Sequence, residues 1–242
     1  MSQDICIAHP PTASKEEWLA ERTKLLAEEK ALTKQYDRVN ALRRRLPMVK
    51  VEKNYRFEGP TGEKSLLELF EGRTQLIVHH FMFDPLWEKG CPSCTFHANA
   101  FGDLSLLARL DTHMVRISRA PFERLESYRQ EKGWTMAWYS SGKSDFNYDF
   151  GVTLDPARGL LEYNYKSVDD IKSVGGIKSS TELPGFSVLF RVGEEVFHTY
   201  SAYGRGVERL MDGLGLADIT PYGRQEDFED SPEGWPQNPT YG

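Results

Sequence analysis

The first part of the chain carries a long helical pattern. Five apolar residues recur every seven positions: Trp18, Leu25, Leu32, Val39 and Leu46. Charged residues fill most of the positions between them. Ser14 with Glu17 three residues later forms a capping box, and Pro47 ends the pattern. We expect a helix over 14–46, which either lies along its own core or packs as an arm on a second subunit.

After Pro47 the pattern changes to strands alternating with shorter helices. Residues 49–57 alternate between apolar and polar, which predicts a strand, and 75–83 are almost continuously apolar, as in a parallel strand buried on both faces. The other expected elements are a turn at 58–62, helices at 65–70, 95–110, 121–132 and 206–214, and strands at 113–119, 186–191 and 195–200. This alternation indicates an α/β domain.

Two segments lack a clear period. Residues 133–185 are rich in Trp, Tyr, Ser, Gly and Asp, and a loop of this length is usually functional or contains further structure. Residues 221–242 are acidic, with Pro and Gly, and suggest an extended tail. We therefore expect a lead and helix over 1–47, a domain over 48–220 with an insertion at about 133–185, and a tail over 221–242.

Composition narrows the classes of function. The formal net charge of −6 argues against a general binder of nucleic acid or anionic membranes. No stretch reaches the length of a membrane span, and residues 1–11 lack the features of a signal peptide. The three cysteines, Cys6, Cys91 and Cys94, are too few for a disulfide framework. We expect a cytoplasmic protein.

The most informative motif is Cys91-Pro92-Ser93-Cys94, between the apolar strand and a helix. A C-x-x-C in this context indicates a redox dithiol. Free backbone N–H groups and the helix dipole favour a thiolate at Cys91, which we expect to be the nucleophile. Cys94 lies on the same helix face and can resolve a mixed disulfide. Pro92 suits the first helical turn, and Ser93 completes the motif.

Other roles for the cysteine pair stay open. A structural zinc needs four ligands, and the chain has only one C-x-x-C unit. His97 extends the motif to Cys-x-x-Cys-x-x-His, with His79 or His80 on the preceding strand as a further ligand. Alternatively, His97 moves protons during exchange or is an ordinary half-buried histidine. The pair could also be structurally inert.

Several further residues are candidates for substrate contacts. Arg119 follows a strand at the edge where α/β proteins bind ligands, so it either holds an anionic substrate or pairs with an aspartate. Aromatic and acidic residues of the insertion either shape a pocket beside Cys91 or pack in the core. They are Trp134, Trp138, Tyr139, Asp145, Tyr148 and Asp149.

This order of elements resembles a thioredoxin-like fold, and the stretch 62–70 is similar to peroxiredoxins. Nearly the whole chain resembles a bacterial family of unknown function, described as predicted dithiol-disulfide oxidoreductases. The matching segments are Glu17-Trp18, 90–94, 118–121, 133–134, 138–140, 145–150, 198–201 and 205–206. The resemblance implies an α/β, thioredoxin-like three-layer sandwich, here with a long N-terminal helix and a long aromatic-rich insertion.

Two positions depart from ordinary thioredoxins. They have a cis-proline immediately before the final hairpin, where this chain aligns Gly185, with Pro184 one residue earlier. They also have a tryptophan next to the first cysteine, whereas Trp87 lies four residues before Cys91. Both differences concern groups near the dithiol, so substrate recognition need not follow that of thioredoxin.

Together these observations predict a dithiol-disulfide oxidoreductase without a cofactor. Its expected partners are a disulfide, thiol or peroxide substrate, an unidentified reductant, and a second copy of the chain bound through the N-terminal helix. The alternative is a non-catalytic binding or redox-sensing module whose Cys91, Cys94 and His97 bind a metal such as zinc.

Overall fold

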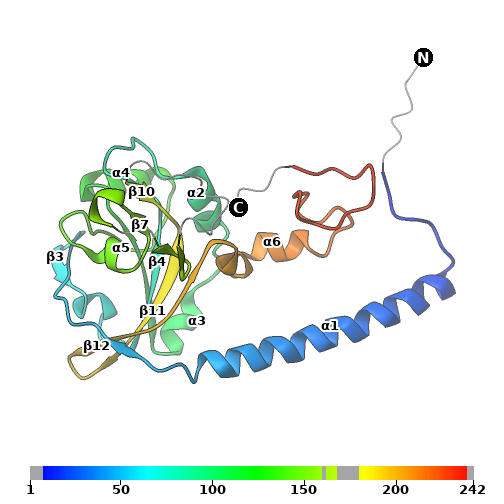
Figure 1. The fold of residues 1–242 in the computed structure, drawn as a ribbon, viewed down its shortest axis with the longest axis horizontal. Helices are drawn as coiled ribbons and strands as arrows, with labels where there is room; N and C mark the ends of the chain where they lie inside the picture. The colour runs from blue at the N-terminus through cyan, green and yellow to red at the C-terminus, as the bar shows by residue number, and fades with distance from the viewer. Residues whose placement is uncertain (1–7, 160–161, 168–179, 239–242) are drawn as a thin grey trace, which may run out of the picture. The chain divides into compact units, whose positions relative to one another are not determined.

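The computed structural model describes residues 8–159, 162–167 and 180–238 (Figure 1). The chain divides into two compact units, one formed by Met1–Pro47 with Leu214–Tyr241 and the other by Met48–Gly213. The two units are described separately below.

The first unit contains the long helix α1 (Lys15–Arg43), as the sequence predicts. The capping box is present, because Ser14 Oγ accepts the N–H of Glu17 at 3.2 Å and the Glu17 carboxylate accepts the N–H of Ser14 at 2.8 Å. The helix ends at Arg43, and a turn of i to i−3 bonds carries the chain to Leu46. No side chain of α1 is buried. Within the described ranges, no helix has the length and apolar character needed to cross a membrane.

The C-terminal part of this unit is held by its own side chains. The helix α6 (Asp212–Ala217) leads into it. The ring of Tyr222 packs edge-on against Trp235, with centroids 5.3 Å apart, and its hydroxyl donates to the carbonyl of Ala8. Arg224 Nε donates to Asp218 Oδ1 at 2.6 Å. The segment after α6 therefore folds locally.

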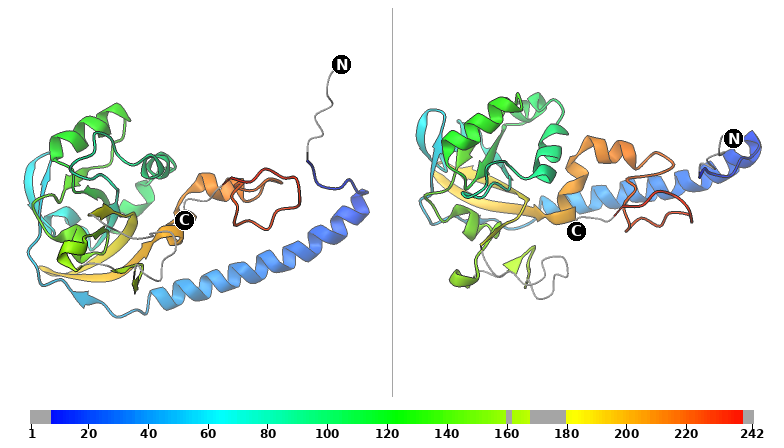
Figure 2. Two further views of the ribbon diagram at one scale, coloured as in Figure 1. Left: turned by 45° about the horizontal axis from the view of Figure 1, so that its top comes forward. Right: turned by 90° about the horizontal axis from the view of Figure 1, so that it is seen from above.

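The second unit is built on one large sheet. In the described part of the chain eight strands form it. Their order is β1 (Val49–Lys50), β12 (Glu195–Tyr203), β11 (Gly185–Val192), β4 (Gln75–His80), β5 (Thr112–Ser118), β6 (Trp138–Ser140), β2 (Arg56–Gly59) and β3 (Gly62–Ser65). Strands β4, β5 and β6 are parallel, and the other neighbours are antiparallel. Figure 2 shows the long β11–β12 hairpin, in yellow to orange, running along the sheet.

Helices and 3₁₀ turns cover both faces of this sheet. Their bounds are η1 (Glu68–Phe70), α2 (Pro92–Asn99), α3 (Ser105–Arg109), α4 (Phe122–Glu131), α5 (Phe146–Asp149), η2 (Pro156–Arg158) and η5 (Gly204–Leu210). Helices α2 and α4 pack on one face, and η1 and α5 pack on the other. The β4–α2–β5 unit followed by the antiparallel β11–β12 hairpin gives the thioredoxin-like three-layer fold that the sequence predicts.

Each face has its own apolar core. On the side of α2 and α4 the main buried residues are Phe81, Phe83, Cys94, Ala98, Ala120, Leu125, Tyr128 and Trp138. On the side of η1 and α5 they include Leu69, Phe70, Leu76, Val78, Ile117, Phe146 and Leu189. The segment 75–83, which begins with β4, supplies both cores: Leu76 and Val78 belong to the core of η1 and α5, and Phe81 and Phe83 to that of α2 and α4. Burial on both faces is in keeping with its many apolar residues and with the burial of His79 and His80.

The expected strand over 49–57 is wrong in one respect. It is two strands: β1 is the first strand in the sheet order, and β2 is the last but one. Strand β1 pairs with β12 through Val49 and His198, whereas β2 pairs with β6 through Glu58 and Ser140. The alternating pattern describes the local conformation of both halves, but it contains no information about which strand each half joins.

The expected helix over 95–110 also differs from the structure. Helix α2 begins at Pro92 and ends at Asn99, and α3 begins at Ser105. Between them Asp103 accepts both the N–H and the hydroxyl of Ser105 at 2.8 Å, which starts a new turn. The expected helix over 206–214 is likewise replaced by η5 and α6.

The insertion contains structure that the sequence does not predict. Its first part supplies β6 to the main sheet and forms α5. Two small antiparallel ribbons follow, formed by β7 (Thr153–Leu154) with β10 (Thr181–Glu182) and by β8 (Glu162–Tyr163) with β9 (Lys166–Ser167). Two-residue strands are too short to leave a periodic signal in the sequence.

Candidate functional site

The two cysteines lie at the start of α2, directly after the loop that follows β4. Cys91 is the N-cap residue of the helix, and Pro92 occupies its first turn. The N–H of Cys91 donates to the carbonyl of Met82 at 3.1 Å, and the N–H of Met82 donates to Cys94 Sγ at 3.5 Å. The same loop residue therefore holds both cysteines in place.

The residue before Cys91 must be small. A Cβ added to Gly90 would lie 2.6 Å from Cε1 of Phe81 and 3.2 Å from Cε1 of Tyr128. On the other side, the hydroxyl of Thr95 donates to the carbonyl of Cys91 at 2.9 Å. The backbone is thus fixed before Cys91 by the packing of Gly90 and after it by the hydrogen bond of Thr95. Neither contact involves the sulfur of Cys91.

The two thiols have opposite electrostatic environments. Both are free, Cys91 is partly exposed and Cys94 is buried. The pKa of Cys91 is lowered to about 6, mainly because the thiol of Cys94 donates to its sulfur, and the N–H groups of Cys94 and Ser93 add to the effect. The pKa of Cys94 is raised, because it donates to Cys91 and because it is buried. Cys91 is therefore the thiol suited to nucleophilic attack.

The three histidines near the motif occupy the core. His97 is buried, and burial lowers its pKa to about 4, so it is neutral at physiological pH. Its ring lies 5.6 Å from that of His79, which stacks on Phe186 at 4.6 Å. His80 points to the other face, where its Nε2 forms a 2.7 Å hydrogen bond with Ser187 Oγ. His80 is thus a hydrogen-bonded core histidine.

The metal-binding alternative finds no ligand cluster. Across residues 8–159, 162–167 and 180–238, no group of three or more His, Cys, Asp and Glu side chains could hold a metal ion. Cys91, Cys94 and His97 therefore do not form such a group. Cys6 lies outside the described residues.

The tryptophans of the insertion lie behind the dithiol, in the core it shares with α4. The indole N–H of Trp138 donates to Ser118 Oγ at 3.0 Å, and that of Trp134 donates to Asn99 Oδ1 at 2.8 Å. Tyr139 points to the opposite face and packs in the core there. These three residues consequently do not line one common surface.

The structure adds a residue that the sequence did not single out. Arg116, in the middle of β5, is only 1% exposed. Its guanidinium carbon lies 4.3 Å from the ring centroid of Trp134 and 5.0 Å from that of Trp138. A charged residue between Val115 and Ile117 in the expected strand 113–119 was the signal available in the sequence.

Arg119 forms a buried ion pair with an acidic residue of the insertion. Its Nη1 donates to Glu182 Oε1 at 2.8 Å, and the hydroxyl of Thr153 lies 3.0 Å from both carboxylate oxygens. The pKa of Glu182 is raised to about 7, mainly by burial, although Arg119 and Thr153 oppose the rise. Arg119 also lies over the ring of Tyr148, 4.7 Å from its centroid. Arg119 thereby attaches the insertion to the end of β5.

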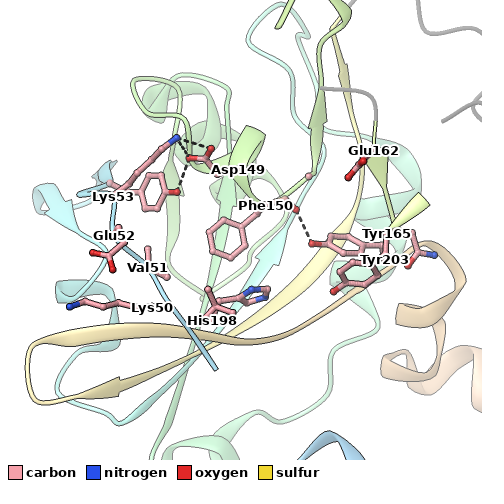
Figure 3. A pocket seen from close by; sticks show the side chains of 14 residues that line it. Lys50, Val51, Glu52, Lys53, Asp149, Phe150, Glu162, Tyr165, His198 and Tyr203 are labelled. Atoms are coloured by element: carbon pink, nitrogen blue, oxygen red, sulfur yellow. Dashed lines mark hydrogen bonds and ion pairs between the residues drawn. The ribbon is translucent and has the colours of Figure 1, made fainter. Parts of the chain in front are cut away.

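The acidic residues of the insertion are paired as well. Asp149 accepts the hydroxyl of Tyr55 and the ammonium of Lys53, both at 2.7 Å, and Asp145 accepts Arg158 at 2.8 Å. Asp149 lines a pocket of about 510 Å³, shown in Figure 3. Neither Cys91 nor Cys94 belongs to its lining. Asp149 and the dithiol thus occupy different sites.

A chain of hydrogen bonds connects this pocket with the sheet interior. His198, which lines the pocket, bonds through Nε2 to Ser201 Oγ at 2.8 Å. Ser201 Oγ lies 2.7 Å from Ser187 Oγ, which in turn bonds His80. The chain crosses β12, β11 and β4 side by side. The sequence indicated His198 only as a residue of the hairpin.

The remaining candidates shape the loops near the motif. The carbonyl of Pro184 accepts the hydroxyl of Tyr163 at 2.8 Å. The described residues contain no cis peptide bond, so the bond before Pro184 is trans. Trp87 is 39% exposed, and its carbonyl accepts Arg124 Nη1 at 2.6 Å. Arg124 also bonds the carbonyl of Pro85, which fixes the loop before the dithiol.

Comparison with known proteins gives one family and a group of solved structures. A model of the family described as "Bacterial protein of unknown function (DUF899)" matches residues 7–241. Peroxiredoxin Q of Xanthomonas campestris is 13% identical at a TM-score of 0.46, over 67% of this chain and 88% of that one. The peroxidoxin BcpB of Mycobacterium tuberculosis is 13% identical at a TM-score of 0.46, over 71% and 96%. No curated protein matches.

Proposed function

We propose that this chain, which belongs to the bacterial family of unknown function DUF899, is a thiol–disulfide oxidoreductase. Cys91 is the nucleophile and Cys94 is the resolving thiol. The observation that carries the proposal is the placement of the two thiols at the start of α2, with the partly exposed Cys91 at the N-cap and the buried Cys94 three residues later. This placement lowers the pKa of Cys91 to about 6, mainly through hydrogen bonding from the Cys94 thiol. Cys91 is then mostly thiolate at neutral pH, and the thiolate is the reactive form.

The first step is attack on a substrate disulfide. The Cys91 thiolate forms a bond to one sulfur, the substrate S–S bond breaks, and the departing sulfur takes up a proton from solvent. The partial exposure of Cys91 supports this assignment, because the sulfur must meet the substrate. A peroxide would instead lose one oxygen to Cys91, giving a sulfenic acid and water or an alcohol.

The second step closes the Cys91–Cys94 disulfide. Cys94 loses its proton and attacks the sulfur of Cys91, and the second substrate sulfur leaves as a thiol. In the peroxide variant the same attack releases water. The substrate gains two electrons, and a dithiol reductant restores Cys91 and Cys94 by the reverse exchange. A reducing compartment such as the cytoplasm suits this cycle.

A redox titration with alkylation and mass analysis tests the proposal. We expect a reversible two-electron couple for Cys91 and Cys94 within roughly −270 to −120 mV, the range of known exchangers. The substitution Cys91→Ser should abolish turnover of a model disulfide, whereas Cys94→Ser should trap the mixed disulfide. Failure to form the internal disulfide under oxidising conditions, or full activity of C91S, would overturn the proposal.

We also propose that α1 joins two copies of the chain. The apolar residues at intervals of seven, together with the absence of a buried side chain on α1, support this arrangement. Light scattering of the full chain should give the mass of a dimer. The double substitution L25E/L32E should give the mass of a monomer, and a monomeric wild type would contradict the proposal.

A further inference from the structure

Arg116 is a buried cation without an ordinary counter-ion. Among the described residues, Cys94 is the one group whose negative charge favours the protonated form of Arg116, and Nη1 of Arg116 has no hydrogen-bond partner. Its Nε donates to Nδ1 of His79 at 3.4 Å, a long bond. Buried charges are normally paired, because their removal from water is costly. Arg116 is therefore suited to pair with a group that becomes negatively charged during only part of a reaction.

The neighbours of Arg116 offer only weak compensation. Trp134, Trp138 and Phe81 surround the guanidinium, with centroids 4.3 Å, 5.0 Å and 5.5 Å from its carbon. The two histidines that face it, His79 and His97, are neutral because burial lowers their pKa. Burial lowers the pKa of Arg116 to about 9, so it stays charged at neutral pH.

Cys94 is an acidic group in the core on which this charge packs. It belongs to the same core cluster as Phe81 and Trp138, the rings that pack on Arg116. The charge of the Cys94 thiolate favours the protonated form of Arg116, and Arg116 favours the thiolate of Cys94. The N–H of Met82 points at the same sulfur. Cys94 thus accepts a backbone N–H and shares the rings of Phe81 and Trp138 with a buried cation.

We propose that Arg116 is a positioning residue whose guanidinium neutralises the Cys94 thiolate formed when Cys91 is bound in a mixed disulfide. This inference rests on the proposed function. In the reduced protein, Cys94 keeps its proton because it donates to the Cys91 thiolate. Once Cys91 forms a covalent bond to substrate, the negative charge of the Cys91 thiolate disappears. Arg116 and the N–H of Met82 then remain to stabilise a thiolate at Cys94.

The chemical step balances without any further reagent. Cys94 gives up its proton, its thiolate attacks Cys91 Sγ, and the bond between Cys91 and the substrate sulfur breaks. The substrate sulfur leaves with the electron pair of that bond and is protonated, so the net proton transfer is from Cys94 to substrate. Arg116 keeps its proton throughout and acts only through its charge.

The first experiment isolates Cys94 and does not depend on activity. In a C6S/C91S protein Cys94 is the only thiol, and the ultraviolet absorbance of its thiolate gives its pKa directly. Adding Arg116→Met should lower the thiolate fraction at a given pH by about tenfold or more. Arg116→Lys, which keeps a charge, should restore part of the effect. Arg119→Gln, which removes a charge from the end of the same strand, should leave it unchanged.

A second experiment separates the two steps of exchange. An aromatic disulfide whose released thiolate is coloured reports attack by Cys91 as its first release and resolution by Cys94 as its second. In a C6S background, R116M should keep the first rate within about twofold and slow the second by about tenfold. If no first release occurs in any variant, the proposed function fails, whereas the titration of Cys94 still decides the role of Arg116.

Folding of the variants is checked by the near-ultraviolet circular dichroism of Trp134 and Trp138. If R116M does not fold, R116K replaces it in both experiments, with a smaller shift in the same direction expected because an ammonium cannot stack as a guanidinium does. An unchanged Cys94 titration and an unchanged second rate in a folded Arg116 variant would overturn the inference.

Discussion

Cys91 and Cys94 lie three residues apart at the start of α2, and hydrogen bonding from the Cys94 thiol is the largest cause of the lowered pKa of Cys91. The same contact raises the pKa of Cys94. One interaction therefore separates the titrations of two chemically identical groups. The difference in burial also raises the pKa of Cys94 relative to that of Cys91, since Cys91 is partly exposed and Cys94 is buried.

The substitution Cys94→Ala should raise the pKa of Cys91 by about one to two units, because the donor is lost while burial remains. The pH dependence of Cys91 alkylation, followed by mass in a C6S background, measures it. Cys94→Ser retains a hydroxyl donor and should give a smaller rise. Equal pKa values in the wild type and C94A would show that the N–H groups of α2 alone activate Cys91.

The substitution Gly90→Ala should destabilise the protein by about 1–3 kcal/mol, because its methyl group would overlap the ring of Phe81. Chemical denaturation measures the free energy of unfolding. Gly213→Ala is the matched control, since no heavy atom lies within 4 Å of an added Cβ there. If G90A is as stable as G213A, Phe81 does not restrict the residue before Cys91.

Glu182 should make stability fall with rising pH. Its pKa in the folded protein is raised from 4.5 to about 7, so its contribution is present below about pH 4.5 and is lost as pH rises through about 7. The change should reach about 1–3 kcal/mol. Urea unfolding of the wild type and of Glu182→Gln at about pH 4.5 and about pH 7 isolates the contribution of Glu182 to the free energy of unfolding. Gln is similar in size but does not titrate. Parallel profiles for the two proteins would contradict this assignment.

The substitution Ser187→Ala should cost about 1–3 kcal/mol of stability, because it removes the hydrogen-bond partner of the buried His80 and Ser201. Thermal unfolding is the measurement. Ser127→Ala is the control, since the hydroxyl of Ser127 bonds only a carbonyl on an exposed part of α4. A similarly small effect for both variants would mean that water replaces the lost hydroxyl at Ser187.

The sequence predicts those elements whose formation depends on residues close together in the chain. Strand β4, the start of a helix at the dithiol, the capping box of α1 and the β11–β12 hairpin all have signals within a few residues. The placement of β1 and β2 has no such signal, because the strands they join lie far away along the chain.

In the candidate site, too, the residues set by local sequence can be predicted, whereas contacts between distant segments cannot. The positions of Cys91 and Cys94 follow from the motif and the helix start alone. The partner of Arg119 is Glu182, far along the chain, and not the aspartate that the sequence suggested as an alternative to a substrate. Arg116 had no local signal of its role, because its aromatic neighbours Phe81 and Trp134 lie after β4 and after α4, and only the folded sheet brings them together.

The tryptophans beside the dithiol make the site its own optical reporter. Trp138 shares a core cluster with Cys94, and Trp134 packs on Trp138 with ring centroids 5.9 Å apart. Disulfides quench the fluorescence of nearby indoles, so formation of the proposed Cys91–Cys94 disulfide should change the emission of the purified protein without any attached dye. The proposed redox change can therefore be followed continuously in solution.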